Sequence, residues 1–484
     1  MPAISADGRY VAQVTFCPVA PNDLNGNAQD VYVYDRLSGT MELASVSSTG
    51  EVGNVGSCTL YYPPTISADG RLVAFYSYSD NLVAGDTNGA LDAFVHDRVT
   101  GETVRVSVDS NGSQGNGDSG MAAISGDGRY VAFTSTATNL VANDWNAAGD
   151  VFVHDLLTHE TVVVSVDDSG VLGNGASFQP SISHFGRLIA FQSEATNLVL
   201  GDTNHEDDVF VHDRATGKTT RASVDSVGLQ GNAASSYPCI SPIQPEVVYQ
   251  SYASNLVAGD TNGSRDVFVH HLLTGQTTLV SVSDSEQLGD DDSGPAGISA
   301  DGRYVAFHSF ATNLVGGDGN GVSDIFLRDR VLAVTRRVSV SSSGEQGNLP
   351  NYLPVISADA RFVAFDSDAT NLVPGDTNGW RDNFVHGAEF TLQAEPEQVA
   401  GGQQLTFDLY RGIPDNVASI WAVKVDSVPV FTKVYASSFD AGGVLTLTGV
   451  VPPGLGTFTL TLRGLAIGAK QFVVSSNDVA VEFE

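Results

Sequence analysis

Gly85-Asp86-Thr87-Asn88-Gly89-Ala90-Leu91-Asp92, followed at once by Ala93-Phe94-Val95-His96-Asp97, is one of seven versions of the same stretch in a chain of 484 residues. The aspartates that close the seven versions are Asp30, Asp92, Asp150, Asp208, Asp266, Asp324 and Asp382. From Asp30 to Asp92 the interval is 62 residues, and every later interval is 58. A fixed period of this length indicates a repeat architecture.

Each repeat predicts four short antiparallel strands. In the third copy, residues 121–125 and 129–135 are apolar runs joined by an Asp-Gly turn, which is a strong hairpin signal. A long loop with the Asp-x-Asn element leads to a third run at 150–155, and a short turn leads to a fourth at 161–166. Four-stranded units in tandem are typical of β-propeller blades. Because the second and third runs each recur seven times, we expect a seven-bladed propeller over residues 1–387.

The run Ile-Ser-Ala-Asp-Gly-Arg-Tyr-Val-Ala-Phe at 298–307 has close versions at 4–13, 66–75 and 356–365. It resembles the signature of TolB-type propeller repeats, which are similar in shape to WD repeats. The resemblance implies a binding or scaffolding propeller, because this repeat type serves many roles. The fifth copy departs from the pattern, since residues 241–246 lack the Asp-Gly-Arg turn.

The period stops near residue 388. Residues 388–484 contain about seven alternating apolar and polar runs, which predict a C-terminal β-sandwich that is similar to the immunoglobulin-like modules of secreted bacterial proteins. The whole chain is therefore expected to be all-β. Two ways of closing the ring stay open: residues 390–393 form the last strand of blade seven, or a strand outside this sequence does.

The chain is strongly acidic, with a formal net charge of −33. The only lysine before residue 388 is Lys218, so no basic patch exists to bind nucleic acid or anionic lipid. No apolar run is long enough to insert into a membrane. Such a surface suits a calcium-rich exterior or a high-salt habitat. The chain starts inside a repeat, so we expect a secreted or cell-surface protein whose export signal is not in this sequence.

Cysteine usage leaves one question open. Cys17 and Cys58 fall in loops that the propeller would bring together, so they form either a disulfide, which would fit an extracellular protein, or two free thiols.

The repeated loop is a candidate cation site. Carboxylate and amide oxygens two and six residues apart, with main-chain carbonyls and water, are ligands that Ca²⁺ prefers. The pattern is similar to integrin-type propeller calcium loops, except that Ala84 stands where those have an acidic residue. The alternative is a purely structural turn, since Asp and Asn also bond their own backbone. The candidate ligands are Asp23, Asn25, Asp30, Asp86, Asn88, Asp92, Asp144, Asn146, Asp150, Asp202, Asn204, Asp208, Asp260, Asn262, Asp266, Asp318, Asn320, Asp324, Asp376, Asn378 and Asp382.

Other chemistry-bearing residues favour structural roles. The recurring histidines sit at one register position of the third strand, which is typical of packing groups. Trp145 and Trp380 lie on loop tips, where they either anchor a sugar or protein partner or pack on a neighbouring loop. The sequence contains no nucleophile elbow, zinc-binding His-Glu-x-x-His or phosphate-binding glycine loop.

The regular repetition favours a protein without catalytic activity, because catalysis needs unlike groups that converge and break the symmetry at one place. We therefore expect a secreted, calcium-binding scaffold or adhesion protein that is not an enzyme and that binds an extracellular protein, a glycan or itself. One alternative is a propeller-type polysaccharide lyase or hydrolase, with blades one and five as the places to look. Another is a self-associating protein of an extracellular fibre or surface layer.

Overall fold

The computed structural model describes residues 2–387 apart from 17–18, 20–22, 24, 27 and 59–61; after residue 387 it describes only the backbone of the strands. The chain divides into two compact units, Met1–His386 and Gly387–Glu484. Among the described residues, no helix has the length and apolar character needed to cross a membrane. Cys17 lies outside the described residues, and Cys58 is a buried free thiol whose pKa burial raises to about 12.

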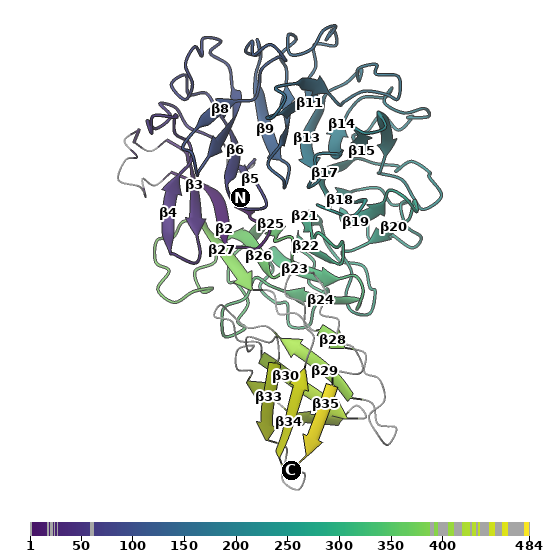
Figure 1. The fold of residues 1–484 in the computed structure, drawn as a ribbon. Helices are drawn as coiled ribbons and strands as arrows, with labels where there is room; N and C mark the ends of the chain where they lie inside the picture. Colours follow the sequence, from purple (N-terminus) through teal and green to yellow (C-terminus); the bar gives the residue numbers. More distant parts are fainter. Residues whose placement is uncertain are drawn as a thin grey trace. The chain divides into compact units, whose positions relative to one another are not determined.

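The first unit is a ring of seven antiparallel sheets, as Figure 1 shows. The innermost strands of the blades are β1 (Ala3–Ile4), β5 (Thr65–Ile66), β9 (Ser119–Ile124), β13 (Ser177–Ile182), β17 (Ser235–Ile240), β21 (Ser293–Ile298) and β25 (Asn351–Ile356). The second strands are β2 (Tyr10–Thr15), β6 (Leu72–Ser77), β10 (Tyr130–Ser135), β14 (Leu188–Ser193), β18 (Glu246–Ser251), β22 (Tyr304–Ser309) and β26 (Phe362–Ser367).

The third strands all begin at the closing aspartate of the repeated stretch. They are β3 (Asp30–Asp35), β7 (Asp92–Asp97), β11 (Asp150–Asp155), β15 (Asp208–Asp213), β19 (Asp266–His271), β23 (Asp324–Asp329) and β27 (Asp382–Gly387). The outer strands of blades one to six are β4 (Thr40–Leu43), β8 (Thr103–Arg105), β12 (Thr161–Val163), β16 (Lys218–Arg221), β20 (Thr277–Leu279) and β24 (Val334–Arg337). The prediction of an all-β, seven-bladed propeller is confirmed.

Each blade buries its strands against the next blade. Along β10, Val131 and Phe133 face one neighbour and Ala132 faces the other, as the two-residue period of a strand requires. A stacked pair of rings recurs in the blades, for example Phe133 and Phe152 with centroids 5.8 Å apart. A single sheet could not bury both faces, so the ring is the stable form.

Hydrogen bonds between the inner turns run from blade to blade around the ring. The Ala6 amide donates to the Ala68 carbonyl, and the Ala68 amide donates to the Gly126 carbonyl. Where the last blade meets the first, the Asp359 amide of blade seven donates to the Ala6 carbonyl of blade one. The first unit is therefore a closed ring.

The Asp-Gly-Arg turn of the repeat has a structural role. In blade three, Arg129 makes two hydrogen bonds of 3.0 and 2.7 Å to Asp155, which is the last residue of β11. Equivalent pairs occur in blades one, two, four and six. Blade five lacks this arginine, and its Glu246 instead lies 2.9 Å from Arg330 of blade six.

The second unit is described by itself. Its strands are β28 (Leu392–Ala394), β29 (Leu405–Tyr410), β30 (Ser419–Val425), β31 (Val428–Phe431), β32 (Val434–Tyr435), β33 (Leu445–Val450), β34 (Thr457–Leu462) and β35 (Val479–Phe483). They form two sheets. Since β28 pairs with β29, residues 392–393 belong to this unit; residues 390–391 lie outside the described residues. The immunoglobulin-like assignment and the boundary at residue 388 stay predictions.

Candidate functional site

The structure brings the closing aspartate and the asparagine of each repeated stretch together. We call each such set an acidic corner; it consists of the loop aspartate, the asparagine and the aspartate that opens the third strand. The asparagine Nδ2 donates to the strand aspartate in the pairs Asn25–Asp30 (2.8 Å), Asn88–Asp92 (3.1 Å), Asn146–Asp150 (2.7 Å), Asn204–Asp208 (3.4 Å), Asn262–Asp266 (2.8 Å), Asn320–Asp324 (3.3 Å) and Asn378–Asp382 (3.0 Å).

The asparagine also fastens the corner to the connection that leads to the next blade. Asn88 Nδ2 donates to the Gly115 carbonyl, and Asn88 Oδ1 accepts from the Ala90 amide. The corners and the connections between blades therefore lie at the same end of the blades. The asparagine orders the loop and turns its amide nitrogen, rather than its oxygen, toward the aspartate.

A serine on the segment after the fourth strand completes the corner in blades one to six. In blade three, Ser165 Oγ donates to Asp150 Oδ1 at 2.7 Å. The same bond recurs in blades one, two and four to six, always 15 residues after the aspartate. This serine was not predicted from the sequence, although its constant spacing from the aspartate was a usable signal. The strand aspartate is fully buried in blade three, and burial raises the pKa of Asp150 to about 6.

Two kinds of corner alternate in blades two to six. In blades two, four and six an arginine of the fourth strand lies between the two carboxylates; Arg221 Nη1 is 3.4 Å from Asp202 Oδ1 and 3.0 Å from Asp208 Oδ2. Arg105 and Arg337 make the same two contacts in their blades. Blades three and five have Val163 and Leu279 at this position. Each corner contains two carboxylates. Among the described residues, no group of three or more His, Cys, Asp or Glu side chains is placed to hold a metal ion.

The recurring histidines join neighbouring blades. His154 Nδ1 lies 2.8 Å from Thr161 Oγ1, and that hydroxyl donates to the Val108 carbonyl of the previous blade. His96, His212 and His270 have the same threonine partner. Burial lowers the pKa of His154 and of His270 to about 4. Trp145 and Trp380 are exposed on their loops.

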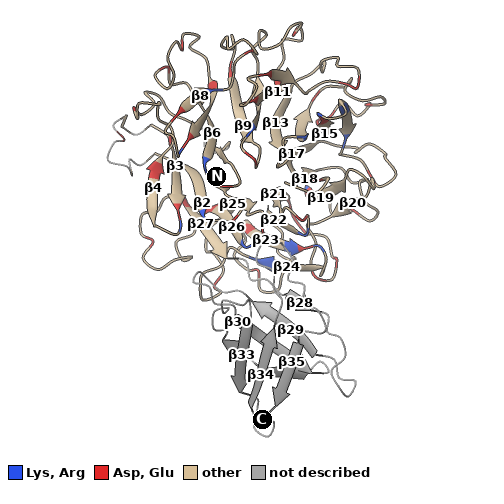
Figure 2. Ribbon diagram, viewed as in Figure 1, with Lys and Arg blue, Asp and Glu red and all other residues tan. Residues whose placement is uncertain are grey.

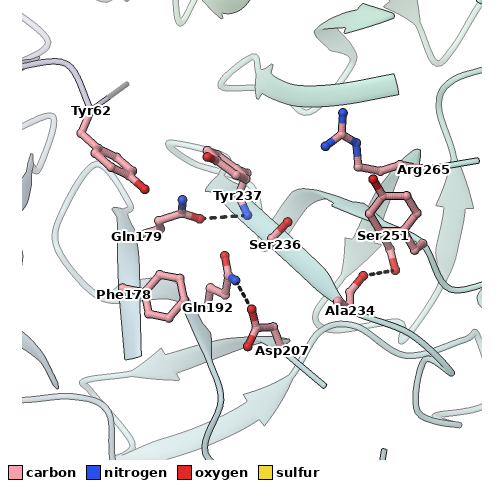
Figure 3. Close-up of a pocket in the computed structure, with 11 residues that line it drawn as sticks. Tyr62, Phe178, Gln179, Gln192, Asp207, Ala234, Ser236, Tyr237, Ser251 and Arg265 are labelled. Carbon is pink, nitrogen blue, oxygen red and sulfur yellow. Dashed lines mark hydrogen bonds between the residues drawn. The ribbon is translucent and has the colours of Figure 1, made fainter. Parts of the chain in front are cut away.

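A pocket lies where blades four and five meet, beside their innermost strands β13 and β17 (Figure 3). It has a volume of about 300 Å³ and is lined by Tyr62, Phe178, Gln179, Gln192, Asp207, Ala234, Ser236, Tyr237, Ser251, Tyr252 and Arg265. Its one cation and its one carboxylate are the residues directly before two closing aspartates: Arg265 before Asp266, and Asp207 before Asp208.

Hydrogen bonds hold these groups in place. Gln192 Nε2 donates to Asp207 Oδ2 at 2.6 Å, and the Tyr237 amide donates to Gln179 Oε1 at 3.2 Å (Figure 3). Gln179 and Tyr237 have φ angles of 54° and 52°, at bulges of β13 and β17. The same bulge recurs in blades three and seven, where Met121 and Leu353 have φ angles of 50° and 53°, so it belongs to the repeat and re-aims one side chain in each of these blades.

Arg265 is held from the blade-six side of the pocket. Its Nε donates to the Ser293 carbonyl at 3.2 Å, and Nη2 lies 3.8 Å from Asp292 Oδ2. The guanidinium carbon is 5.7 Å from the centre of the Tyr252 ring. This orientation presents a fixed positive charge beside an aromatic ring.

Two of the positions that line the pocket vary from blade to blade. The residue directly before the closing aspartate differs in every blade except two, in the order Gln29, Leu91, Gly149, Asp207, Arg265, Ser323 and Arg381. The position of Gln192 in the second strand keeps a glutamine, Gln250, in the next blade and then becomes His308 and Asp366. The sequence analysis missed these positions because it weighed the features that the copies share.

No protein-family model matches the chain, and no curated protein matches it. Solved propellers do. An oligogalacturonate lyase in complex with manganese is 12% identical with a TM-score of 0.47, over 80% of this chain and 87% of that one. A prolyl endopeptidase is 12% identical with a TM-score of 0.47, over 85% of this chain and 54% of that one. A putative TolB from Agrobacterium tumefaciens is 15% identical with a TM-score of 0.34, over 57% and 78%.

These comparisons correct two expectations. The prediction of a secreted scaffold that is not an enzyme is wrong, because an oligogalacturonate lyase and peptidases stand among the similar propellers and no finding points to a non-catalytic scaffold. The alternative of a propeller-type enzyme is better supported. At these identities the likeness shows the fold alone. The chemistry of the site is therefore argued from the residues of the pocket.

Proposed function

We propose that the protein is an enzyme that cleaves a polysaccharide in the pocket between blades four and five. The observation that carries the proposal is the convergence of one arginine, one carboxylate, two amide side chains and several aromatic rings around one pocket, with the charged groups at a position that varies between the repeats. Catalysis needs such unlike groups around one position, and a concave site with few polar groups is the usual place for them.

The lining suits a sugar. The rings of Tyr62, Phe178, Tyr237 and Tyr252 supply flat apolar faces on which a sugar ring can stack. The amides of Gln179 and Gln192 can both donate to and accept from sugar hydroxyls. A volume of about 300 Å³ gives room for a small part of a chain, and the remainder would lie along the ends of the blades.

The charges favour elimination over hydrolysis. Glycoside hydrolysis uses two carboxyl groups on either side of the scissile bond, whereas the lining contains a single carboxylate, Asp207. Elimination from a uronic acid needs a cation that offsets the sugar carboxylate, and a base that removes the neighbouring carbon-bound proton. Arg265 and Asp207 fit these two roles, and the arginine can bind a carboxylate through two hydrogen bonds.

Tyr237 fits the third role, the protonation of the leaving oxygen. Burial raises the pKa of Tyr237, and the neighbouring Tyr62 adds to the rise, so the hydroxyl keeps its proton at neutral pH. In the proposed step, Asp207 takes the proton from carbon 5 of a uronate, and the electron pair forms a carbon–carbon double bond. The glycosidic bond breaks, and Tyr237 donates its proton to the leaving oxygen.

In this proposal, the expected calcium has a structural role. The acidic corners lie beside the pocket in sequence, not among its lining residues, so a cation in the corner of blade five would order the loop that carries Arg265. The manganese in the similar lyase structure is a property of that protein. A glycan partner fits an exported protein, and the secreted or cell-surface location stays a prediction.

A screen of polyuronates and neutral polysaccharides tests the proposal. Elimination gives an unsaturated product that absorbs ultraviolet light, and hydrolysis gives reducing ends without that absorbance. We expect absorbance from a polyuronate, and we expect Arg265→Ala to lower kcat/KM at least about 100-fold.

Arg381→Ala is the matched control. Arg381 holds the same repeat position in blade seven and bonds Asp368 at 2.9 Å, away from the pocket. Its activity should stay within about threefold of the unaltered protein. Reducing ends without absorbance would replace elimination by hydrolysis; no turnover of any polysaccharide, or equal losses in the two variants, would end the proposal.

A further inference from the structure

The acidic corners of blades two to six divide by what stands opposite the two carboxylates. In blades two, four and six the fourth strand supplies an arginine and the following connection a glutamine: Arg105 with Gln114, Arg221 with Gln230, and Arg337 with Gln346. In blades three and five the same two positions are aliphatic: Val163 with Leu172, and Leu279 with Leu288. We call these two kinds arginine corners and aliphatic corners.

The arginine corners satisfy their own charges. In blade four, Arg221 contacts both aspartates, and Gln230 Nε2 donates to Asp202 Oδ1 at 2.8 Å and to Asp208 Oδ2 at 3.1 Å. In blade six, Gln346 repeats both bonds, at 2.8 Å to Asp318 and 2.7 Å to Asp324. Two side chains from outside the loop thus supply one positive charge and further hydrogen bonds.

The aliphatic corners contain the equivalent two carboxylates but neither the arginine nor the glutamine. In blade five, Asp266 is fully buried and Asp260 is 8% exposed, yet no described residue donates a hydrogen bond to the Asp260 carboxylate or forms an ion pair with it. In blade three, Asp144 Oδ1 is buried without a hydrogen-bond partner among the described residues. Val163 and Leu279 present only hydrocarbon at the position of the arginine.

Burial of two facing carboxylates without a counter-charge is costly, because the neutral donors that bond Asp150 and Asp266 do not offset the negative charge. The repeats show what relieves this cost, since a guanidinium lies between the equivalent carboxylates of blades two, four and six. Carboxylate oxygens are hard ligands, and Ca²⁺ accepts two carboxylates with carbonyls and water in a flexible shell.

We propose that the aliphatic corners of blades three and five each bind one hard divalent cation of the calcium class. It lies between Asp144 and Asp150 in blade three and between Asp260 and Asp266 in blade five, where the arginine corners have their guanidinium. Blade one is excluded, because the Tyr32 hydroxyl donates to Asp23 at 2.5 Å. The two ligands of the blade-five cation, Asp260 and Asp266, flank Arg265 in sequence. The cation would therefore order the loop that carries this arginine.

The test counts calcium ions by isothermal titration calorimetry on the full chain, after removal of metal with a chelator. Leu279→Arg should lower the number of bound ions by one, and Val163→Arg with Leu279→Arg should lower it by two. Leu279→Met is the matched control and should leave the number unchanged.

The reverse exchange makes the test independent of lost folding. Arg221→Leu with Gln230→Leu turns an arginine corner into an aliphatic one and should add one ion. The melting temperature of each variant with calcium and with chelator reports folding: calcium should raise it for the unaltered protein and should raise it further for this double variant. The proposal is overturned if the unaltered protein binds no calcium, or if the number of ions is the same in both exchanges.

Discussion

Gln192 Nε2 lies 2.6 Å from Asp207 Oδ2, so the single carboxylate of the pocket is held by an amide donor from the neighbouring strand. The bond therefore fixes the direction in which the other oxygen of Asp207 can take a proton.

The first prediction concerns this pair. Asp207→Asn should lower kcat for a polyuronate about 100-fold or more, because the base is lost. Gln192→Leu should lower kcat less than Asp207→Asn does, since the base is kept but loses the donor that orients it. Thr134→Val, at the same repeat position in blade three, should leave kcat unchanged. A kcat of Gln192→Leu equal to that of the unaltered protein would show that the pair has no role in the reaction.

The second prediction concerns an arginine corner. In chelator, Arg221→Leu should destabilise the fold by about 3 kcal/mol, because it leaves two buried carboxylates without their cation. Adding Asp202→Asn to Arg221→Leu should restore part of the loss by removing one charge. Urea unfolding measures both changes. Equal stability of the single and double variants would mean that the arginine packs without offsetting charge.

The third prediction tests ring closure. Gly8 has a φ of 74°, and a Cβ there would lie 2.0 Å from Cδ2 of Phe362 in blade seven. Gly50 has a φ of 82°, and nothing lies within 4 Å of its Cβ position. Gly50→Ala should therefore cost about 1 kcal/mol for the backbone, whereas Gly8→Ala should cost about 1–3 kcal/mol more because it separates blades one and seven. Equal melting temperatures of the two variants would argue against the closed seam.

The fourth prediction concerns acid stability. The pKa of His154 is about 4 in the folded protein and ordinarily about 6.5. The unfolded chain therefore binds a proton between these values that the folded state does not bind, and stability falls as the pH is lowered from 6.5 to 4. The effect of this one side chain is up to about 3 kcal/mol. His154→Gln should lose less stability between pH 7 and pH 5 than the unaltered protein, as measured by thermal unfolding.

The control for acid stability is His205→Asn, which changes an exposed histidine. It should keep the full dependence on pH. If His154→Gln and His205→Asn respond to acid in the same way, the acid sensitivity lies elsewhere. Asp150 and Asp266, whose pKa values are raised to about 6, act in the opposite direction, because their stability contribution is present at low pH and is lost as the pH rises through 6.

The sequence predicted the architecture well because propeller packing depends on the features that the repeats share. The alternating Val131 and Phe133, the Asp-Gly turn and the opening aspartates each act within one blade or between neighbours, so one copy predicts the others. The corners were predicted for the same reason, since Asn88 and Asp92 lie close in sequence.

The pocket could not be predicted in that way. Arg265 and Asp207 are 58 residues apart in sequence and line one pocket only because two blades pack side by side in the ring. Regular repetition was taken as evidence against catalysis, whereas a position that varies from blade to blade supplies both charged groups of the pocket. Arg221 was missed for a related reason: it lies on the fourth strand, 13 residues after Asp208, and it is present in alternate copies only.

The arginines recur at twice the blade period: Arg105 to Arg221 and Arg221 to Arg337 are both 116 residues. The unit that repeats in full is thus a pair of blades, and a gene that grew by doubling would copy such pairs. Seven is odd, however, and two kinds cannot alternate all the way round an odd ring. Blade six has an arginine and blade one has Leu43 at this position, whereas Glu395 stands 13 residues after Asp382 of blade seven. The alternation therefore breaks between blade six and blade one.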